Sequence, residues 1–454
     1  MKETNIVALE IGSSKIKGAV GSIDDNGVLT VRVVDEEPLL DSVRYGVVSN
    51  AEEVANRASR LLDRLEDRSG NKTITGVYVA LGSRSMRTDP RETERILPQE
   101  MEITADIIEQ LMAEAAAATS PSRDQIDVVP REFIVDKTRV LKPIGTLGSS
   151  ILMRSNIVSC RPQIKRNLCH LVNEKLSLDI FGFPVRQIAQ ADFVITHDEK
   201  RLGCMLVDCG AETTTVSIYK HGHLQYMQTM PLGSRNITRD LTHLNYLEEQ
   251  AEEVKIHYGN AKAGAFSAEV NTNIDLATVN KFVAARAGEI IANIKEQVKQ
   301  AGFMPKDLPS GIILVGRGAR LAGFSERLAD TVDLRVRLGT SVRTDVRLAD
   351  PRISISDSVD VISTLYAASR HNPMECLEEP EPVYVPEPEP VRTVEPKEEP
   401  EPEPERKPAA DQRPAKKTKQ SWFRKVGDQL VKLVDENRVD DDDDDEGVMI
   451  EDKD

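Results

Sequence analysis

The sequence predicts an α/β fold built from two similar halves. Runs of β-branched residues alternate with helical periodicity and glycine turns over residues 1–374. A strand ending in acid-x-Gly-small occurs twice, at residues 9–14 and again at 207–212, and each copy leads into another strand. We therefore expect each half to open with a β-hairpin whose tip carries an acid and a glycine.

The elements of the two halves can be assigned in order. Alternating or continuous apolar runs predict strands at residues 6–11, 15–22, 28–34, 73–81 and 214–220. Apolar side chains at helical spacing predict helices over 51–66 and 279–301. His221-Gly222-His223 falls in an expected hairpin turn, so we interpret it as a turn and not as a metal pair.

Charge separates this folded body from a tail. Residues 375–454 contain 26 acidic and 13 basic residues, so they hold 13 of the 16 net negative charges. The body is nearly neutral, which argues against binding nucleic acid by bulk charge. Five cysteines without a C-x-x-C pair indicate neither a disulfide framework nor a zinc site, and no apolar run of about 18 residues is present to span a membrane.

The two tips have a composition suited to phosphate. Glycine lets backbone N–H groups approach phosphate oxygens, and Glu10 and Asp208 could hold Mg²⁺ through water. Acid-x-Gly is also a common turn, so one copy alone would mean little. A third glycine turn, with Gly316, Arg317 and Gly318 after an apolar strand, lies where α/β folds place ligands, although it matches neither G-x-G-x-x-G nor a P-loop.

These segments together resemble the FtsA family of bacterial cell-division proteins, within the actin/Hsp70/sugar-kinase ATPase superfamily. The resemblance covers residues 1–436 and includes an unusual Glu10 where actins carry Asp. It rests on these further segments: residues 10–15, 129–133, 143–145, 159–160, 208–215, 251–255 and 316–318, with Arg286.

The resemblance implies an actin-like two-lobed ATPase fold with a 1C-type insertion. Its implied parts are subdomain 1A at 1–83 and 163–197, 1C at 84–162, 2A at 198–228 and 306–374, and 2B at 229–305. A disordered Pro/Glu-rich linker at 375–419, an amphipathic helix at 420–436 and an acidic disordered tail at 437–454 would follow.

The resemblance also implies ATP and Mg²⁺ as cofactors, with Glu10 and Asp208 holding the metal through water. The implied nucleotide-binding residues are Glu10, Gly12, Ser13, Ser14, Lys15, Asp208, Gly210, Ala211, Glu212, Thr213, Gly233, Glu252, Lys255, Gly316, Arg317 and Gly318.

The implied partners follow the same family pattern. Arg286 and Glu289 would bind the C-terminal peptide of FtsZ, although the residues alone favour a solvated ion pair. The chain would also self-associate into filaments and contact downstream division proteins through 1C. It would act as a peripheral protein on the cytoplasmic face of the cell membrane, at the division septum.

Some residues depart from the family pattern. In the second phosphate motif Ala211 and Glu212 replace glycines and Thr215 replaces an acid, and Glu212 would bring a negative charge close to phosphate. Arg317 replaces a glycine and could stack on adenine or fill its pocket. These changes endanger hydrolysis more than binding, so we expect slow or absent hydrolysis and assign no catalytic residue.

The predicted C-terminal helix carries one apolar face beside a basic cluster. Its apolar residues recur every three or four positions and include the only tryptophan of the chain: Trp422, Phe423, Val426, Leu430, Val431, Leu433 and Val434. This pattern is typical of helices that lie in a membrane interface, or alternatively of a helix that docks on protein. The aspartates at 440–445 would oppose binding to anionic lipid.

Two other classes of function remain open from the sequence. One is a small-molecule kinase of the same superfamily, and the other is a chaperone-like or pilus-assembly-type ATPase. Neither class needs both a Pro/Glu-rich linker and an amphipathic end, so the interpretation as a membrane tether is favoured.

Overall fold

The computed structural model describes residues 3–117, 122–262, 264, 274–340 and 343–379. The predicted linker beyond residue 379, the amphipathic helix at 420–436 and the acidic tail lie outside the described residues. Among the described helices, none combines the length and the apolar character that crossing a bilayer requires.

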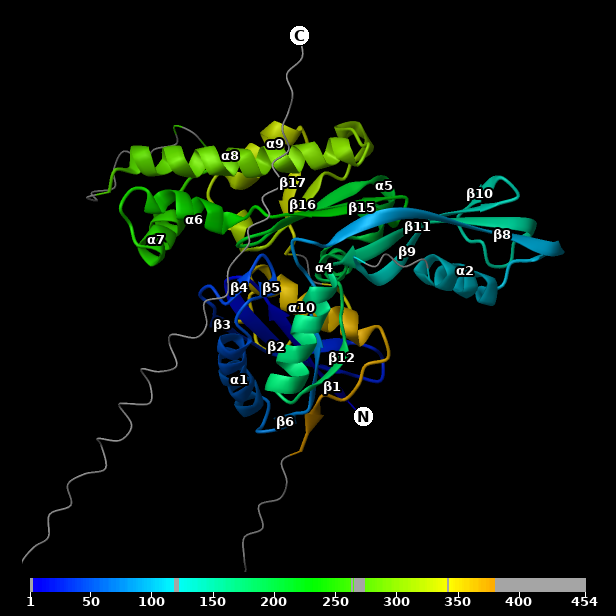
Figure 1. The fold of residues 1–454 in the computed structure, drawn as a ribbon, viewed down its shortest axis with the longest axis horizontal. Coiled ribbons are helices and arrows are strands. Elements are labelled where there is room, and N and C mark those ends of the chain that lie inside the picture. Colours follow the sequence, from blue (N-terminus) through cyan, green and yellow to red (C-terminus); the bar gives the residue numbers. More distant parts are fainter. Residues whose placement is uncertain (1–2, 118–121, 263, 265–273, 341–342, 380–454) are drawn as a thin grey trace, which may run out of the picture. The chain divides into compact units, whose positions relative to one another are not determined.

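The first half of the fold is a six-stranded sheet in the order β12-β7-β1-β2-β3-β18 (Figure 1). Strands β1, β2 and β3 form consecutive antiparallel hairpins, whereas β7 and β12 continue the sheet in parallel from β1. The strands are β1 (Thr4–Ile11), β2 (Lys15–Ile23), β3 (Leu29–Pro38), β7 (Gly76–Val79), β12 (Asp179–Gly182) and β18 (Val346–Leu348).

The second half repeats this topology. In the order β17-β16-β13-β14-β15, three strands again form antiparallel hairpins and two continue in parallel from the first of them. The strands are β13 (Cys204–Cys209), β14 (Thr214–Lys220), β15 (His223–Met230), β16 (Ile312–Val315) and β17 (Val336–Leu338). The predicted duplication is therefore confirmed at the level of strand order and direction.

The two predicted tips also share their turn geometry. The N–H of Gly12 donates to the carbonyl of Lys15, and the N–H of Gly210 donates to the carbonyl of Thr213, both at 2.9 Å. The same local sequence pattern thus produces the same turn in both halves.

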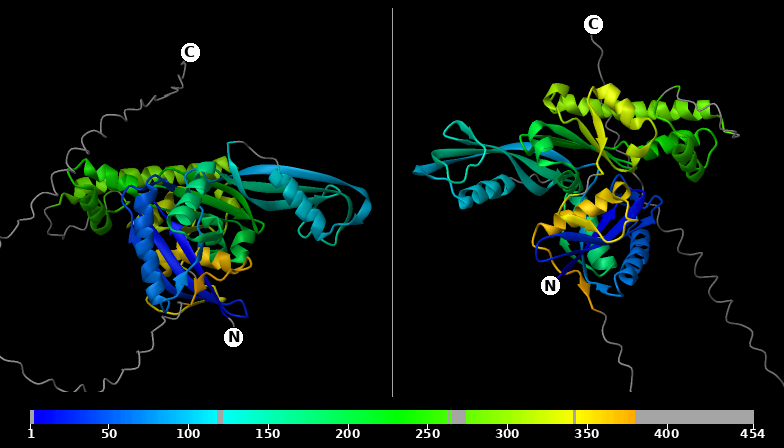
Figure 2. Two further views of the ribbon diagram at one scale, coloured as in Figure 1. Left: turned by 60° about the horizontal axis from the view of Figure 1, so that its bottom comes forward. Right: turned by 180° about the vertical axis from the view of Figure 1, so that it is seen from behind.

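Helices cover both faces of the first sheet (Figure 2). On one face α1 (Ala51–Arg68) packs close to Gly18, and on the other α10 (Ile355–Ser369) packs close to Gly21. Helix α4 (Arg186–Val194) lies beside α10, and its first residue, Arg186, lies next to the two hairpin tips. Helix α3 (Pro162–Cys169) is continued by a π-helical turn (His170–Lys175), and this turn contacts α1.

A further group of elements, the inserted layer, lies between β7 and α3 in the sequence. It consists of β8 (Arg87–Glu102), α2 (Ala105–Ala117), β9 (Asp124–Val135), β10 (Thr138–Val140) and β11 (Leu147–Cys160). These strands extend the second sheet through β8 and β15, yet they enclose a small apolar core of their own around Leu111, Ile151 and Met153.

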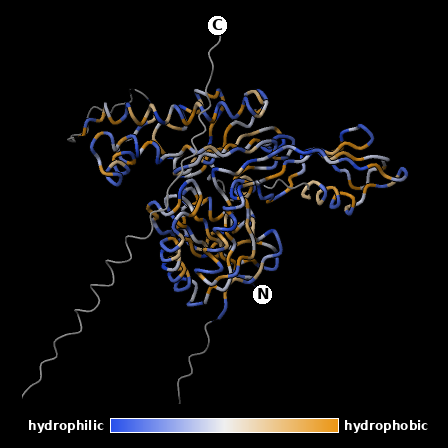
Figure 3. The backbone as a smooth tube through the Cα atoms, in the orientation of Figure 1, coloured by the Kyte–Doolittle hydropathy of each residue, from blue (hydrophilic) through white to orange (hydrophobic). Residues whose placement is uncertain are grey.

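The second sheet carries the remaining helices. They are α5 (His197–Leu202), α6 (Ser234–Thr242), α7 (Glu248–Tyr258), α8 (Leu276–Gln300) and α9 (Phe324–Val332). Short elements complete the fold: β4 (Val43–Arg44), β5 (Val47–Val48), β6 (Thr73–Ile74), β19 (Leu377–Glu378) and 3₁₀ turns at Pro305–Asp307 and Arg317–Arg320. Figure 3 shows apolar residues concentrated in the interior of the half that contains the first sheet, where a buried core cluster lies.

Two expectations differ from the structure at their edges. The strand expected at 73–81 is divided into β6 and β7. The folded body also continues past the expected linker start at 375, because Cys376 and Leu377 are buried and β19 pairs with β6. The buried side chains of Cys376 and Leu377 keep this short segment packed on the body, even though the sequence after it is rich in proline and glutamate.

Candidate functional site

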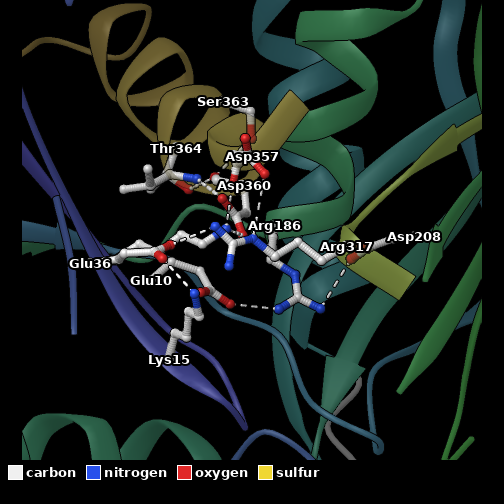
Figure 4. A network of polar contacts seen from close by, with 12 residues as sticks. Glu10, Lys15, Glu36, Arg186, Asp208, Arg317, Asp357, Asp360, Ser363 and Thr364 are labelled. Atoms are coloured by element: carbon white, nitrogen blue, oxygen red, sulfur yellow. Dashed lines mark hydrogen bonds and ion pairs between the residues drawn. The ribbon is translucent and has the colours of Figure 1, made fainter. Parts of the chain in front are cut away.

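The two predicted tips meet at one guanidinium, that of Arg186 at the start of α4. Its Nη1 donates to Glu10 of the first tip at 2.8 Å, and its Nη2 lies 3.1 Å from Asp208 of the second (Figure 4). The side chains of all three residues are nearly buried. The acids that the sequence placed on opposite halves of the chain are therefore brought together, and a cation of the chain itself joins them.

A second ion pair, between Lys17 and Asp360, lies next to Glu10. Glu10 is opposite Lys17 in the β1–β2 hairpin, and Nζ of Lys17 is 2.5 Å from Asp360 of α10. Burial and, to a smaller extent, the negative charge of Asp360 raise the pKa of Glu10 to about 7. The positive charges of Arg186 and Lys17 act in the opposite direction on this pKa. Burial lowers the pKa of Arg186, but Asp208 and Glu10 together raise it above its ordinary value, so the guanidinium stays charged.

The backbone at both tips offers donors to a ligand. Within the described residues, the N–H groups of Ser13, Ser14 and Ala211 have no hydrogen-bond acceptor. The tip at Ser13 is nevertheless fixed, because its Oγ accepts from the N–H of Gly46 and its carbonyl accepts from Arg235 of α6. Unpaired N–H groups on a fixed turn suit an anion such as phosphate.

The Glu212 carboxylate, which the sequence places close to phosphate, is neutralised by arginines. Its side chain is fully buried, accepts from the N–H of Tyr45 and from Arg239 at 2.6 Å each, and pairs with Arg44 at 3.1 Å. Arg235 is a more distant partner at 3.8 Å. The negative charge that would repel a phosphate is thus balanced by arginines of the chain itself. Through these contacts the Glu212 carboxylate links the segment around Tyr45 to α6.

Two glycines let the second tip pack closely. Gly316 has a φ of +86°, and a Cβ there would lie 2.4 Å from the carbonyl oxygen of Cys209. A Cβ on Gly233 would lie 2.4 Å from the carbonyl oxygen of Ala211. Any side chain at either position would push the turn at Gly316 or the start of α6 away from the tip.

Arg317 is engaged in ion pairs. Its guanidinium lies 2.9 Å from Glu36 and 3.7 Å from Asp357 at the start of α10. Lys15 of the first tip pairs with the same Glu36. Arg317 lines a cavity of about 480 Å³ together with Lys17, Glu36 and Asp357. The predicted stacking of Arg317 on adenine would require it to leave these partners.

The predicted residues of α7 are tied to α6. The Glu252 carboxylate accepts from Thr238 and from Lys255 at 2.5 and 2.6 Å, and Nζ of Lys255 also donates to Thr238. Burial lowers the pKa of Lys255, whereas Glu252 opposes that shift and remains partly exposed. Glu252 is therefore the member of this pair that a ligand can reach.

Thr215 stands where the resemblance leads us to expect an acid. Its hydroxyl bonds to Thr229 at 2.9 Å and accepts from the amide of Gln187 at 3.4 Å. The same amide of Gln187 also donates to Asp208 at 3.5 Å, so Thr215 adds a buried neutral hydroxyl next to that carboxylate.

The predicted magnesium site does not fit the observed geometry. One oxygen of each acid, Oε1 of Glu10 and Oδ2 of Asp208, is directed at Arg186, so a metal ion or its water shell would compete with the guanidinium for these carboxylates. No cluster of three or more His, Cys, Asp or Glu suited to a metal ion occurs among the described residues. The backbone fits a phosphate, whereas the acid pair is already matched by a guanidinium.

Arg286 and Glu289 lie away from the tips on α8. They form the ion pair that their spacing predicts. Arg286 also donates two hydrogen bonds to the carboxylate of Asp240 in α6, at 2.7 and 3.0 Å, in a bidentate contact. Hydrogen bonding to Asp240 raises the pKa of Arg286, with Glu289 adding to it and burial opposing it. A peptide carboxylate would have to share this guanidinium with two intramolecular acids.

Sequence reasoning missed several residues of the site. Arg186 follows Pro184 at a helix start and belongs to no motif, and the arginines around Glu212 are scattered along the chain. Lys17 could have been found, because the β1–β2 register predicts that it faces Glu10.

Comparison with known proteins gives a consistent family. The family described as "Cell division protein FtsA" matches residues 205–358, and the "SHS2 domain inserted in FTSA" matches 85–159. The cell division protein FtsA of Porphyromonas gingivalis is 29% identical over 384 residues, covering 81% of this chain and 79% of that protein. FtsA of Bacillus subtilis is 27% identical over 364 residues, covering 76% and 80%.

Among solved structures, the chain is similar to one of a PilM–PilN type IV pilus biogenesis complex. The TM-score is 0.56 at 16% identity, with 80% of this chain and 96% of that chain covered. At this identity the likeness concerns the fold. The chain thus has an actin-like α/β fold with an SHS2 insertion at β8–β11.

Proposed function

Since the chain belongs to the FtsA family of cell division proteins, we propose that it binds ATP between its hairpin tips, polymerises and tethers FtsZ to the cytoplasmic membrane. The observation that carries the nucleotide part is the meeting of the two tips, each a glycine turn with unpaired N–H groups, around a buried cation. The tether part rests on the family and on the predicted C-terminal helix.

In this proposal the phosphates of ATP lie between Ser13 and Ala211, and the adenosine lies toward Gly316 and Glu252. A triphosphate is drawn to this place because the N–H groups of the tips and Nε of Arg186 are donors without an acceptor among the described residues. Because Glu212 is held by arginines, it adds no net repulsion.

The first prediction concerns the tip glycines. We expect Gly12→Asp and Gly210→Asp each to abolish ATP binding, since the new carboxylate would stand among the donors that face the phosphates. The alanine variants at the same positions are the matched controls, because they add the Cβ without the charge. Binding of a fluorescent ATP analogue would measure the difference. Aspartate variants that bind as well as the alanine variants would contradict the phosphate site.

ATP turnover is expected to be slow, because Thr215 offers a hydroxyl where the family resemblance implies a carboxylate that would orient a water. A sustained rate near the ordinary enzyme median, on the order of 10 s⁻¹, would contradict this expectation. The same assay with sugars in place of water tests the kinase alternative.

We also propose that the FtsZ C-terminal peptide binds where α6 and α8 meet. Arg286 is about three-quarters buried, and its guanidinium is bound by Asp240 and Glu289. Of these two acids Glu289 is the more exposed, so it is the one that an incoming carboxylate can displace.

The second prediction follows from this arrangement. Arg286→Glu should weaken peptide binding about tenfold, because a third acid would join Asp240 and Glu289, whereas Glu289→Gln should strengthen it by freeing one arm of the guanidinium. Lys299→Glu makes the same charge change at an exposed position of α8 and should leave the affinity unchanged. Fluorescence anisotropy with the labelled peptide measures all three variants. An Arg286→Glu variant that binds the peptide as tightly as the parent would remove Arg286 from the interface.

The remaining parts of the proposal concern location and assembly. The chain would lie on the cytoplasmic face of the cell membrane at the septum, held by the apolar face of residues 420–436. It would form filaments through its actin-like body, and the inserted layer at β8–β11 would contact downstream division proteins.

A further inference from the structure

The buried guanidinium of Arg186 lies where an actin-like nucleotide site would be expected to hold its metal. We propose that Arg186 replaces the divalent cation between the two hairpin tips, so that this chain binds the phosphates of a nucleotide without Mg²⁺. The inference rests on the proposed nucleotide binding and specifies which positive charge that binding uses.

The contacts of Arg186 are those of a bridging cation. One nitrogen reaches a carboxylate of the first half at 2.8 Å and the other a carboxylate of the second half at 3.1 Å. Like a bound metal ion, the guanidinium thus links Glu10 and Asp208, two acids that come from separate parts of the sequence. A planar group with several donors suits this task better than an ammonium group would.

The surroundings of Arg186 are shaped for it. Its backbone N–H donates to the carbonyl of Leu81 at 3.0 Å, and a Cβ on Gly82 would lie 3.2 Å from the guanidinium carbon. The glycine therefore leaves the space that the guanidinium fills. Only 15% of the Arg186 side chain is exposed, against 6% and 5% for Glu10 and Asp208.

One donor of this cation remains open. The Nε of Arg186 is buried and has no hydrogen-bond partner among the described residues. A buried N–H without an acceptor is costly and points to a group that is supplied from outside, and a phosphate oxygen is an acceptor of the right kind.

A divalent metal would have to compete with this arrangement. Mg²⁺ prefers oxygen ligands in nearly octahedral order, and entering between Glu10 and Asp208 it would displace the guanidinium from both. The displaced Arg186 would be a buried cation without partners, which is strongly unfavourable. The site therefore favours its own fixed charge over a metal ion.

The test compares nucleotide binding by the full chain with and without metal. We expect a fluorescent ATP analogue to bind the parent with about the same affinity in EDTA as in excess Mg²⁺. Arg186→Gln should lose about tenfold or more in EDTA, and Mg²⁺ should restore part of the loss by entering between the freed acids. Arg201→Gln removes an exposed arginine and controls for the loss of one positive charge.

A second measurement needs no nucleotide. Titration with Mn²⁺ followed by electron paramagnetic resonance should show one additional bound ion in Arg186→Gln compared with the parent. That ion should be lost again in Arg186→Gln/Asp208→Asn. All variants share the same acidic tail, so any Mn²⁺ that the tail binds is common to them and the differences report on the site.

The outcomes separate the inference from the proposed function. A parent that loses about tenfold or more of its affinity in EDTA overturns the inference and leaves nucleotide binding standing. The inference is also overturned if the parent binds Mn²⁺ at a site that Asp208→Asn removes. Absence of nucleotide binding in both buffers overturns the inference together with the nucleotide part of the proposed function.

Discussion

Replacing Glu212 by alanine should lower the free energy of unfolding by about 3 kcal/mol. The carboxylate is fully buried and is the common partner of Arg44 and Arg239, so its removal leaves two cations facing each other with only the longer 3.9 Å contact of Arg44 to Asp41 as counter-charge. The N–H of Tyr45 would lose its acceptor as well. Because the arginines reach solvent in part, we expect the lower end of the range known for broken buried pairs.

Equilibrium urea unfolding would measure this loss. Circular dichroism is the appropriate signal, because Trp422, the only tryptophan of the sequence, lies outside the described residues. Glu248→Ala is the matched control, since Glu248 also faces an arginine, at 3.6 Å from Arg235, but is well exposed. If both variants unfold at the same urea concentration, the arginine cluster around Glu212 contributes no more than a surface pair.

Loss of membrane binding is the largest effect that we expect from the C-terminal segment. Trp422→Glu combined with Leu430→Glu should abolish vesicle binding, because two charges would enter the apolar face of the predicted helix. A chain truncated after Lys419 should behave in the same way and remain folded. Removing residues 440–454 should leave binding intact or raise it, most clearly at low salt, where charges are least screened.

Liposome flotation of these three variants beside the parent would decide the question. A single interfacial helix binds reversibly, so filament formation should strengthen attachment by making later insertions intramolecular. Residues 380–419 would reach on the order of 120 Å if extended like polyproline, so each helix can find the surface. A double variant that floats as well as the parent would mean that the helix docks on protein instead.

The sequence predicted the features that depend on local pattern. The repeated acid-x-Gly tips were found because each lies within six consecutive residues, and their turns formed as expected at Gly12 and Gly210. The helix at 51–66 was found for the same reason, since its apolar spacing lies within one segment, and α1 extends it only by a short distance.

Features that depend on long-range pairing could not be predicted. Glu212 was expected to repel phosphate, but it forms an ion pair with Arg44. Arg44 lies more than 160 residues before Glu212, and no local sequence pattern predicts this contact. Arg317 was expected at adenine, yet it pairs with Glu36 from the other half of the chain. In each case a charged residue of a motif forms an ion pair with a residue that is distant in the sequence and lies close to it only in the folded chain.

The central claim is that one chain holds the FtsZ tail and the membrane at the same time. The most direct test is co-flotation of a labelled FtsZ tail peptide with liposomes in the presence of the chain. The account predicts that the peptide floats with the parent, but not with Arg286→Glu or with the Trp422→Glu/Leu430→Glu variant. Peptide that floats equally with the parent and with both variants, or that stays unbound with the parent, would contradict it.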